Sequence, residues 1–388
     1  MSNSPINRNP DLQRLVAEGY EVEIIADHLV IRSVPYVDQD RQVRRGALVS
    51  ELNEETRKPK THVIMFAGDF PCDKDGKILD RIIKSKAAKK ISEALTVSCS
   101  FSSKPPEGYP DYYQKITTYV TILQNEAQAI DPNANARTWR VIPNPVAESP
   151  FEYVDTASSR AGITYASGKL SLESVAIVGL GGTGSYVLDL LAKTPVSKIH
   201  LFDGDKFGQH NAFRTPGAPS LDHLRTIPFK VDHWAGIYSA MHRGIVPHPT
   251  SITPENLHLL RDMKFVFICA DAGGAKGAIF RELESASVPF IDTGMGLGLE
   301  DDTLHGMLTV TLSTPSKRDH VAERVSLAGD GHENIYAKNI QVADLNMFSA
   351  ALAVIKYKKL LGFYDDRRHE HFINYMIGGN VLLSEDRA

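Results

Sequence analysis

The residues with the clearest chemical implication form a glycine-rich stretch, G-L-G-G-T-G, at residues 179–184. The stretch follows a short apolar run, residues 175–178, and precedes apolar side chains at helical spacing. Glycines let the chain turn sharply and let a ligand approach main-chain N–H groups, and the start of a helix carries about half a unit of positive charge. Both features suit phosphate, so the pattern predicts a nucleotide site; a tight turn without a ligand is the alternative. The glycines are Gly179, Gly181, Gly182 and Gly184.

An acidic residue follows at a distance that fits nucleotide binding. Asp203 directly follows the next apolar run, residues 198–202, and Asp205 comes two positions later in D-G-D. In dinucleotide folds, an acidic residue about 20 positions after the glycines binds a ribose hydroxyl. We therefore expect Asp203 to bind ribose. Up to this point the pattern fits a nicotinamide- or flavin-dependent oxidoreductase as well as an ATP-dependent enzyme.

Asn211 and Arg214 distinguish these two classes. They follow D-G-D on a loop that leaves the carboxyl end of the strand, the edge where ligands bind in open α/β sheets. A guanidinium group offers a planar fork of donors that matches phosphate oxygens. The pair suits an enzyme that neutralises a triphosphate. ATP-dependent chemistry is thus the favoured prediction, and an NAD(P)- or flavin-dependent oxidoreductase and a non-catalytic nucleotide-binding scaffold are the alternatives.

Three segments in succession, V-A-I-V-G-L-G-G-T-G-S, D-G-D and H-N-A-F-R, resemble the ThiF/MoeB superfamily of enzymes that activate ubiquitin-like proteins. The resemblance covers roughly residues 155–388. Those enzymes bind MgATP and attach AMP to the C-terminal glycine carboxylate of a β-grasp protein. The resemblance therefore implies ATP and Mg²⁺ as cofactors and a ubiquitin-like protein as partner.

The resemblance also implies a role for individual residues. The glycines, Asp203 and Asp205 would bind the nucleotide, and Asn211 and Arg214 its β- and γ-phosphates. Lys230, in I-P-F-K-V-D, matches a lysine that contacts the phosphates. Asp271, at the end of F-V-F-I-C-A-D, matches the aspartate that binds Mg²⁺. Arg160 resembles an arginine that reaches into the partner subunit's site in dimers, which implies a homodimer.

The chemistry gives each residue type a reason to be present. A carboxylate that approaches ATP is an anion approaching an anion, so the barrier is chiefly charge repulsion. Positive charge from Arg214, Lys230 and Mg²⁺, which is held by Asp271, would stabilise the crowded negative charge as pyrophosphate leaves. No general base is needed because the attacking group is already ionised.

The cysteines depart from the pattern of many relatives. The sequence has no paired CxxC motifs, so structural zinc is not expected, and residues 312–344, where relatives carry a thioester-forming cysteine, contain none. Cys269 is expected to be buried in an apolar strand. Cys72 is expected to be exposed in a polar turn, where nearby aspartates raise the pKa of its thiol. Cys99 is assigned to core packing or, with Cys72, to a thioester; these alternatives stay open.

Periodicity indicates the elements that position these residues. Short apolar runs at residues 175–179, 198–202, 265–270 and 288–292 are typical of strands buried on both faces of a parallel sheet. A long helix is expected from Asp344, with Leu352, Ile355 and Leu360 on its apolar side, followed by a final strand near residues 372–377. The glycine-rich residues 293–298 are expected to form either an exposed backbone channel for a diglycine-like tail or a flexible loop.

The first half of the chain differs in texture. Residues 20–25 and 28–34 predict a hairpin, residues 62–67 a strand, and residues 82–95 and 112–130 helices. We therefore expect an α/β protein: a Rossmann-like, doubly wound, mostly parallel sheet with antiparallel C-terminal strands at residues 151–388, preceded by a smaller α+β module at residues 1–150.

That first module, through V-P-Y-V at residues 34–37 and H-V-I-M-F-A-G-D-F-P-C at residues 62–72, is similar to the N-terminal module of activating enzymes from bacterial ubiquitin-like conjugation operons, including antiphage systems. The resemblance implies docking of the ubiquitin-like protein, of a conjugating enzyme or of a second copy.

Composition excludes several other classes. Of 388 residues, 42% are hydrophobic and 23% charged, as in folded proteins rather than disordered chains. The formal net charge of −4 gives no bulk attraction for nucleic acid. Only three cysteines fit a reducing compartment, and no signal peptide or membrane-spanning run is recognised. A cytoplasmic protein is expected.

Overall fold

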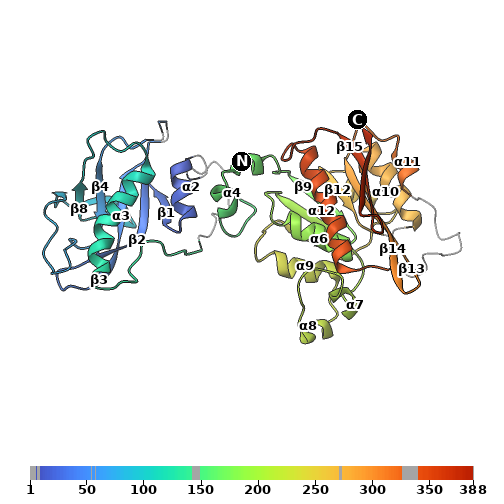
Figure 1. The fold of residues 1–388 in the computed structure, drawn as a ribbon, viewed down its shortest axis with the longest axis horizontal. Coiled ribbons are helices and arrows are strands. Elements are labelled where there is room, and N and C mark those ends of the chain that lie inside the picture. Colours follow the sequence, from blue (N-terminus) through green and yellow to red (C-terminus); the bar gives the residue numbers. More distant parts are fainter. Residues whose placement is uncertain are drawn as a thin grey trace. The chain divides into compact units, whose positions relative to one another are not determined.

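The computed structural model describes residues 6, 9–53, 55–56, 58–141, 149–270, 273–325 and 340–387. The chain divides into two compact units (Figure 1). We call them the N-terminal unit, Met1–Glu148 with Tyr153–Thr164, and the C-terminal unit, Ser149–Glu152 with Tyr165–Ala388. In the described part of the chain, no helix has both the length and the apolar character needed to cross a bilayer.

A six-stranded antiparallel sheet forms the centre of the N-terminal unit, in the order β1-β2-β3-β4-β8-β5. The predicted hairpin is confirmed, because β1 and β2 pair and both turn residues, Ala26 and Asp27, have positive φ. Helix α3 packs on the sheet, where Phe66, Phe101 and Tyr119 fill the core. The elements of this unit are β1 (Glu21–Ile25), β2 (His28–Val37), β3 (Val43–Glu51), β4 (Val63–Ala67), β5 (Ile83–Ser85), β6 (Lys89–Ser92), β7 (Leu95–Val97), β8 (Cys99–Ser102), α2 (Pro10–Ala17), α3 (Tyr112–Gln128) and α4 (Thr156–Arg160).

The helix predicted over residues 82–95 is wrong, because this stretch forms the short strands β5, β6 and β7. Its apolar residues serve two different cores. Ile82 and Ile83 pack against the cluster that contains α3, whereas Leu95 and Val97 belong to a separate cluster with Val30. A single helix has one apolar face and could not fill both cores.

An eight-stranded sheet forms the C-terminal unit, in the order β11-β10-β9-β12-β13-β14-β15-β16. The first five strands run parallel, and β14, β15 and β16 are antiparallel, as predicted. The elements are β9 (Ser174–Val178), β10 (Lys198–Phe202), β11 (Ile245–His248), β12 (Phe265–Ile268), β13 (Phe290–Glu300), β14 (Thr303–Ser313), β15 (Glu370–Met376), β16 (Val381–Arg387), α6 (Gly182–Leu191), α7 (Gln209–Ala212), α8 (Leu221–Arg225), α9 (Lys230–Tyr238), the 3₁₀ helix η1 (Leu257–Leu260), α10 (Gly273–Ser285), α11 (Val321–Arg324) and α12 (Ala343–Leu360). Helix α5 (Thr164–Gly168) lies where one unit passes into the next along the chain.

Helices cover both faces of this sheet (Figure 1). Strand β9 shows why: Val175 and Ile177 belong to the cluster that contains residues of α6, α9 and α12, whereas Ala176 and Val178 belong to the cluster with α10 and η1. Alternate side chains of one strand are thus buried on opposite faces, which explains its unbroken apolar sequence. The doubly wound fold predicted from the sequence is confirmed.

Two local predictions in this unit need correction. Residues 293–298 do not form a loop, since β13 continues to Glu300 and pairs with β14 along its whole length. In α12, Ile355 and Leu360 are exposed, while Asn346, Ser349 and Ala350 are buried. The buried residues of this helix thus include small and polar side chains beside the apolar Leu352, Val354 and Tyr357.

Candidate functional site

A cavity of about 340 Å³ lies at the carboxyl ends of the central parallel strands. We call it the glycine-turn cavity. Its lining residues include Gly179 and Gly181 from the turn after β9, Gly182 and Thr183 from the start of α6, Asp203, Asp205 and Arg214 from the loops after β10, Lys230 from α9, Cys269 just after β12, and Thr293 and Gly294 from β13. The structure therefore brings together most of the residues that the sequence singled out.

Each glycine of the turn occupies its position for a different structural reason. Gly179 has a φ of +90°, and a side chain on Gly184 would overlap the carbonyl oxygen of Gly179. A Cβ added to Gly181, in contrast, would meet no atom of the described structure within 4 Å. Gly181 also precedes α6 without a side-chain cap, so no capping side chain occupies the N–H groups at this helix start. The main chain at Gly181 is open to a ligand.

Asp203 is buried and holds the turn together. One carboxylate oxygen accepts a hydrogen bond from the N–H of Leu180 at 2.7 Å, and the other accepts one from the N–H of Asp205 at 2.8 Å. Its side chain is 8% exposed and lines the cavity. The predicted contact with ribose stays a prediction.

Lys230 is the first residue of α9 and is also buried. Its ammonium group donates to Asp205 at 2.6 Å and to Asp203 at 3.4 Å. An ammonium group has three donors, so one is left for a ligand in the cavity that Lys230 lines.

The position of α9 is supported by a histidine pair. His233, one turn after Lys230, lies with its Nδ1 atom 2.7 Å from Nε2 of His223 in α8, and its ring stacks on Phe207. Burial, with a smaller contribution from His223, lowers the pKa of His233 to about 4. The imidazole of His233 is therefore neutral at physiological pH, and it braces the helix start that carries Lys230.

Arg214 and Asn211 have different surroundings. Arg214 lines the cavity, and its buried Nε atom has no hydrogen-bond acceptor among the described residues. Asn211 is 1% exposed and is not among the lining residues. Its Oδ1 atom accepts from the N–H of Gly208 at 2.9 Å, while its Nδ2 atom has no acceptor in the described structure. Arg214 thus has donor capacity at the cavity, whereas Asn211 shapes the short helix α7.

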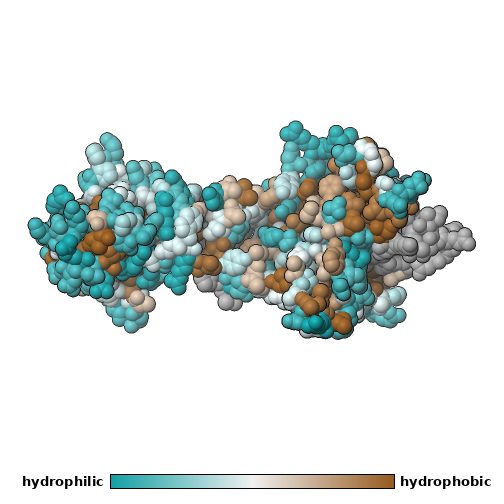
Figure 2. Space-filling model, turned by 60° about the horizontal axis from the view of Figure 1, so that its bottom comes forward, coloured by the Kyte–Doolittle hydropathy of each residue, from teal (hydrophilic) through white to brown (hydrophobic). Residues whose placement is uncertain are grey.

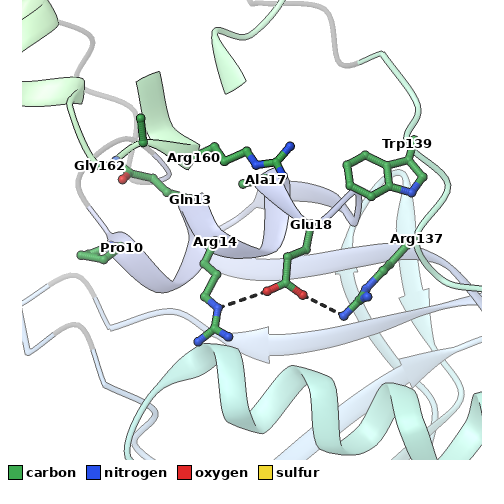
Figure 3. Close-up of a pocket in the computed structure, with 10 residues that line it drawn as sticks. Pro10, Gln13, Arg14, Ala17, Glu18, Arg137, Trp139, Arg160 and Gly162 are labelled. Atoms are coloured by element: carbon green, nitrogen blue, oxygen red, sulfur yellow. Dashed lines mark hydrogen bonds and ion pairs between the residues drawn. The ribbon is translucent and has the colours of Figure 1, made fainter. Parts of the chain in front are cut away.

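Arg160, like Asn211, is not among the described residues that line this cavity. Asp271 lies outside the described residues, and the residues that are described contain no cluster of three or more metal-binding side chains. Arg160 belongs to α4 of the N-terminal unit and lines another cavity, of about 620 Å³ (Figure 3). There Glu18 pairs with both Arg14 and Arg137, at 3.1 and 2.7 Å.

Sequence reasoning missed Asn346, a fully buried residue of α12. Its side chain contacts Thr183 and the main chain of Arg214, and it fills the space where a side chain of Gly182 would lie. Asn346 thereby links the glycine turn to the arginine loop. The signal in the sequence that could have identified Asn346 is a polar residue among the apolar residues of a long predicted helix.

The cysteine predictions need correction. Cys72 is fully buried rather than exposed, because its main chain bridges to Val37 and Ile78. Burial raises the pKa of the Cys72 and Cys99 thiols, and Asp73 adds to the effect at Cys72. Cys269 is not inside a strand: β12 ends at Ile268, and Cys269 is half-buried at the cavity wall.

Comparison with known proteins adds two family matches. Residues 10–156 match a domain of unknown function, DUF6791, and residues 162–377 match the ThiF family. No curated protein matches the chain.

Among solved structures, E. coli MccB with ATP is 20% identical, covers 60% of this chain and 72% of its own, and has a TM-score of 0.48. MccB with MccA-N7isoASN is also 20% identical, with coverages of 60% and 70% and a TM-score of 0.47. PaaA is 18% identical, with coverages of 57% and 75% and a TM-score of 0.44. The ThiF match spans more than half of the sequence, and this protein therefore belongs to the ThiF family.

Proposed function

We propose that this protein activates the C-terminal carboxylate of a ubiquitin-like protein by attaching AMP from ATP to it. One observation carries the proposal: a single cavity combines open main chain at Gly181 with the guanidinium group of Arg214 and the ammonium group of Lys230. This combination suits a polyphosphate, because helix N–H groups and cations all favour negative charge.

The residues present fit a triphosphate. The guanidinium group of Arg214, which lines the cavity, and the third donor of Lys230 are the cationic donors that we propose for the phosphate oxygens. Mg²⁺ is part of the proposal through Asp271, and when bound it would add positive charge beside the phosphates. Asn211 does not reach the cavity in this structure, so we propose that it supports the phosphate site by holding the loop before Arg214.

In the proposed reaction, a carboxylate oxygen of the protein substrate forms a bond to the α-phosphorus of ATP. The bond from that phosphorus to the bridging oxygen breaks, and pyrophosphate leaves. Arg214 and Lys230 stabilise the negative charge that accumulates, since they are positioned before the reaction begins. The carboxylate attacks as an anion, so no side chain has to remove a proton.

The edge of β13 supports an extended protein tail as the substrate. Strand β12 pairs with β13 only as far as Asp292, while β13 continues to Glu300. Among the described residues, the edge of β13 beyond Asp292 that faces away from β14 pairs with no strand, and it starts at Thr293 and Gly294 in the cavity wall. Such an edge can hydrogen-bond an extended peptide. A glycine-ended tail has the slender shape that this route requires.

The acyl adenylate is the proposed product. A thioester at Cys72 or Cys99 is disfavoured because both thiols are buried and burial raises the pKa of each. We propose that the adenylate passes to a separate acceptor, such as a conjugating enzyme. The setting, a cytoplasmic bacterial conjugation pathway with a role in antiviral defence, is proposed on the resemblance of the N-terminal module.

A homodimer is part of the same proposal, with residues 1–150 as a docking module and residues 151–388 as the adenylation domain. Apolar side chains gather in patches on the unit that carries the glycine turn, on the face that Figure 2 shows. Exposed large apolar side chains also flank the cavity residues in sequence, at Phe213, Leu221 and Ile227. Such side chains favour contact with a second protein.

The experiment that tests the proposal is ATP–pyrophosphate exchange in the presence of a β-grasp protein that ends in glycine. We expect Arg214→Ala to lower the exchange rate by about 10²- to 10³-fold, because one preorganised cation is lost. Arg225→Ala is the matched control, since Arg225 is an exposed arginine paired with Asp222 on nearby α8. An exchange rate equal to that of the wild type in Arg214→Ala would overturn the assignment of Arg214 to the phosphates. An oxidoreductase would catalyse no exchange and would instead change the absorbance of a nicotinamide cofactor.

A further inference from the structure

Asn346 occupies the space between two parts of the glycine-turn cavity. Helix α12 lies beside α6 (Figure 1) and places this side chain against the start of α6. Its Oδ1 atom accepts a hydrogen bond from the Thr183 hydroxyl at 3.0 Å, and its Nδ2 atom donates to the main-chain carbonyl of Arg214 at 3.2 Å. A Cβ on Gly182 would overlap the Asn346 amide, so Gly182 is a glycine because of this contact.

The chemistry of the contacts requires an amide. The Arg214 carbonyl can only accept, so the atom that faces it must be a donor, and the other end of the amide is left to accept from Thr183. Aspartate has the same shape but two acceptor atoms, and its oxygen would repel the carbonyl. Leucine has a similar volume but makes neither bond.

Helix stability does not explain an asparagine at this position. Asn is a poorer helix former than Ala or Leu, and a buried amide is costly unless its hydrogen bonds are made. Val342 caps α12, so Asn346 is not a cap. What Asn346 provides is a tie between two segments that are more than 30 positions apart in sequence, residues 182–183 and the loop at Arg214.

We propose that Asn346 is a positioning residue that holds the Arg214 loop in register with the glycine turn, so that both act on the same polyphosphate. The inference rests on the proposed function, since it names a residue that makes the nucleotide site work. Asn346 acts through the main chain of Arg214 and does not itself contact the ligand. Loss of the tie would leave both phosphate-binding groups present but misaligned.

The test is calorimetric titration of the full-length protein with MgATP, which needs no protein substrate. We expect Asn346→Asp and Asn346→Leu each to weaken MgATP binding by about tenfold or more, because misplacement of a preorganised group by small distances is costly. Ser349→Ala is the matched control: Ser349 is buried one turn later on α12, and its hydroxyl has no partner in the described structure. This variant should bind MgATP like the wild type.

A double-mutant cycle separates positioning from a merely structural role. If Asn346 acts through Arg214, Asn346→Leu should weaken MgATP binding strongly in the wild type and only slightly in the Arg214→Ala background. Equal weakening in both backgrounds would overturn the inference, as would wild-type affinity in Asn346→Asp and Asn346→Leu. Should Asn346→Leu fail to fold, the isosteric Asn346→Asp takes its place in the cycle. Failure of the wild type to bind MgATP would instead refute the proposed function, so the two failures are distinguishable.

Discussion

At the scale of single residues, the glycine turn shows that one motif can serve several purposes. Gly179 has a positive φ, and Gly184 lies too close to the Gly179 carbonyl oxygen for a side chain. Gly182 makes room for Asn346, and of the four glycines only Gly181 has no described atom near the position of a Cβ. The sequence pattern treats these positions alike. Their surroundings account for the other three glycines without a ligand, whereas no described atom fills the space at Gly181.

This difference leads to a prediction about two substitutions. Gly181→Ala adds a methyl group that meets no described atom, so we expect MgATP binding to weaken because the methyl group enters the ligand's space, while the fold loses stability only through the backbone conformation at φ −73° and ψ −143°. Gly182→Ala places the same group against Asn346 and should destabilise the fold by about 1–3 kcal/mol. Thermal melting and calorimetry measure the two effects. Unchanged MgATP affinity in Gly181→Ala would show that the turn is not a ligand site.

The cysteines illustrate the limits of local sequence at this scale. Cys72 follows a proline in a polar turn, which favours exposure, yet its main chain pairs with Val37, 35 positions away in sequence, and the thiol is buried. The sequence of the turn alone does not indicate which residue of another strand will pack against it. The prediction of an exposed thiol failed because a tertiary contact overrode the local pattern.

At the scale of elements, strands and helices were predicted correctly where the apolar side chains of a segment all followed a single periodicity. Strand β9 is buried on both faces, and in β10 only Lys198 is exposed and His200 half-buried; the bounds of both strands agree with the expected ones within one residue. Residues 82–95 failed because their apolar side chains are shared between two cores. The length of β13 was also missed, because its glycines suggested a loop although β14 pairs with all of it.

Elements also explain which part of the site could be predicted. Asp203 and Arg214 follow β10 in sequence, and Lys230 begins α9, which comes after the short helices α7 and α8, so all three lie between β10 and the next strand, β11, and line the same cavity. Asn346 arrives from α12, whose expected face included Ile355 and Leu360. Because the polar residues Asn346 and Ser349 lie among the buried residues of α12, the rule that apolar residues mark the buried side missed Asn346.

At the scale of the whole molecule, the two units match two different families. The predicted homodimer would in addition let one copy of the chain contribute a residue to the nucleotide site of the other. Arg160 was predicted to serve the site of a second subunit. Within its own unit it lines a cavity that does not include the glycine turn.

Mixed dimers test this role. We expect Arg160→Ala and Arg214→Ala to be inactive separately and to regain activity together, because a mixed dimer contains one site with both arginines intact. A random mixture should recover about one quarter of wild-type exchange activity, since half of the dimers are mixed and each has one of two sites restored. Sedimentation verifies that subunits exchange. Exchanged dimers without recovery would show that Arg160 does not act in the partner's site.

The mass of the protein substrate tests most directly whether the enzyme adenylates the terminal carboxylate of a protein at its glycine-turn cavity. After incubation of the enzyme with MgATP and a glycine-ended β-grasp protein, intact mass spectrometry should show the substrate with one AMP attached. Removal of its last glycine should abolish the product. Two results would contradict adenylation of a terminal carboxylate: the wild-type enzyme binds MgATP but the β-grasp protein never acquires AMP, or the β-grasp protein acquires AMP equally well without its terminal glycine.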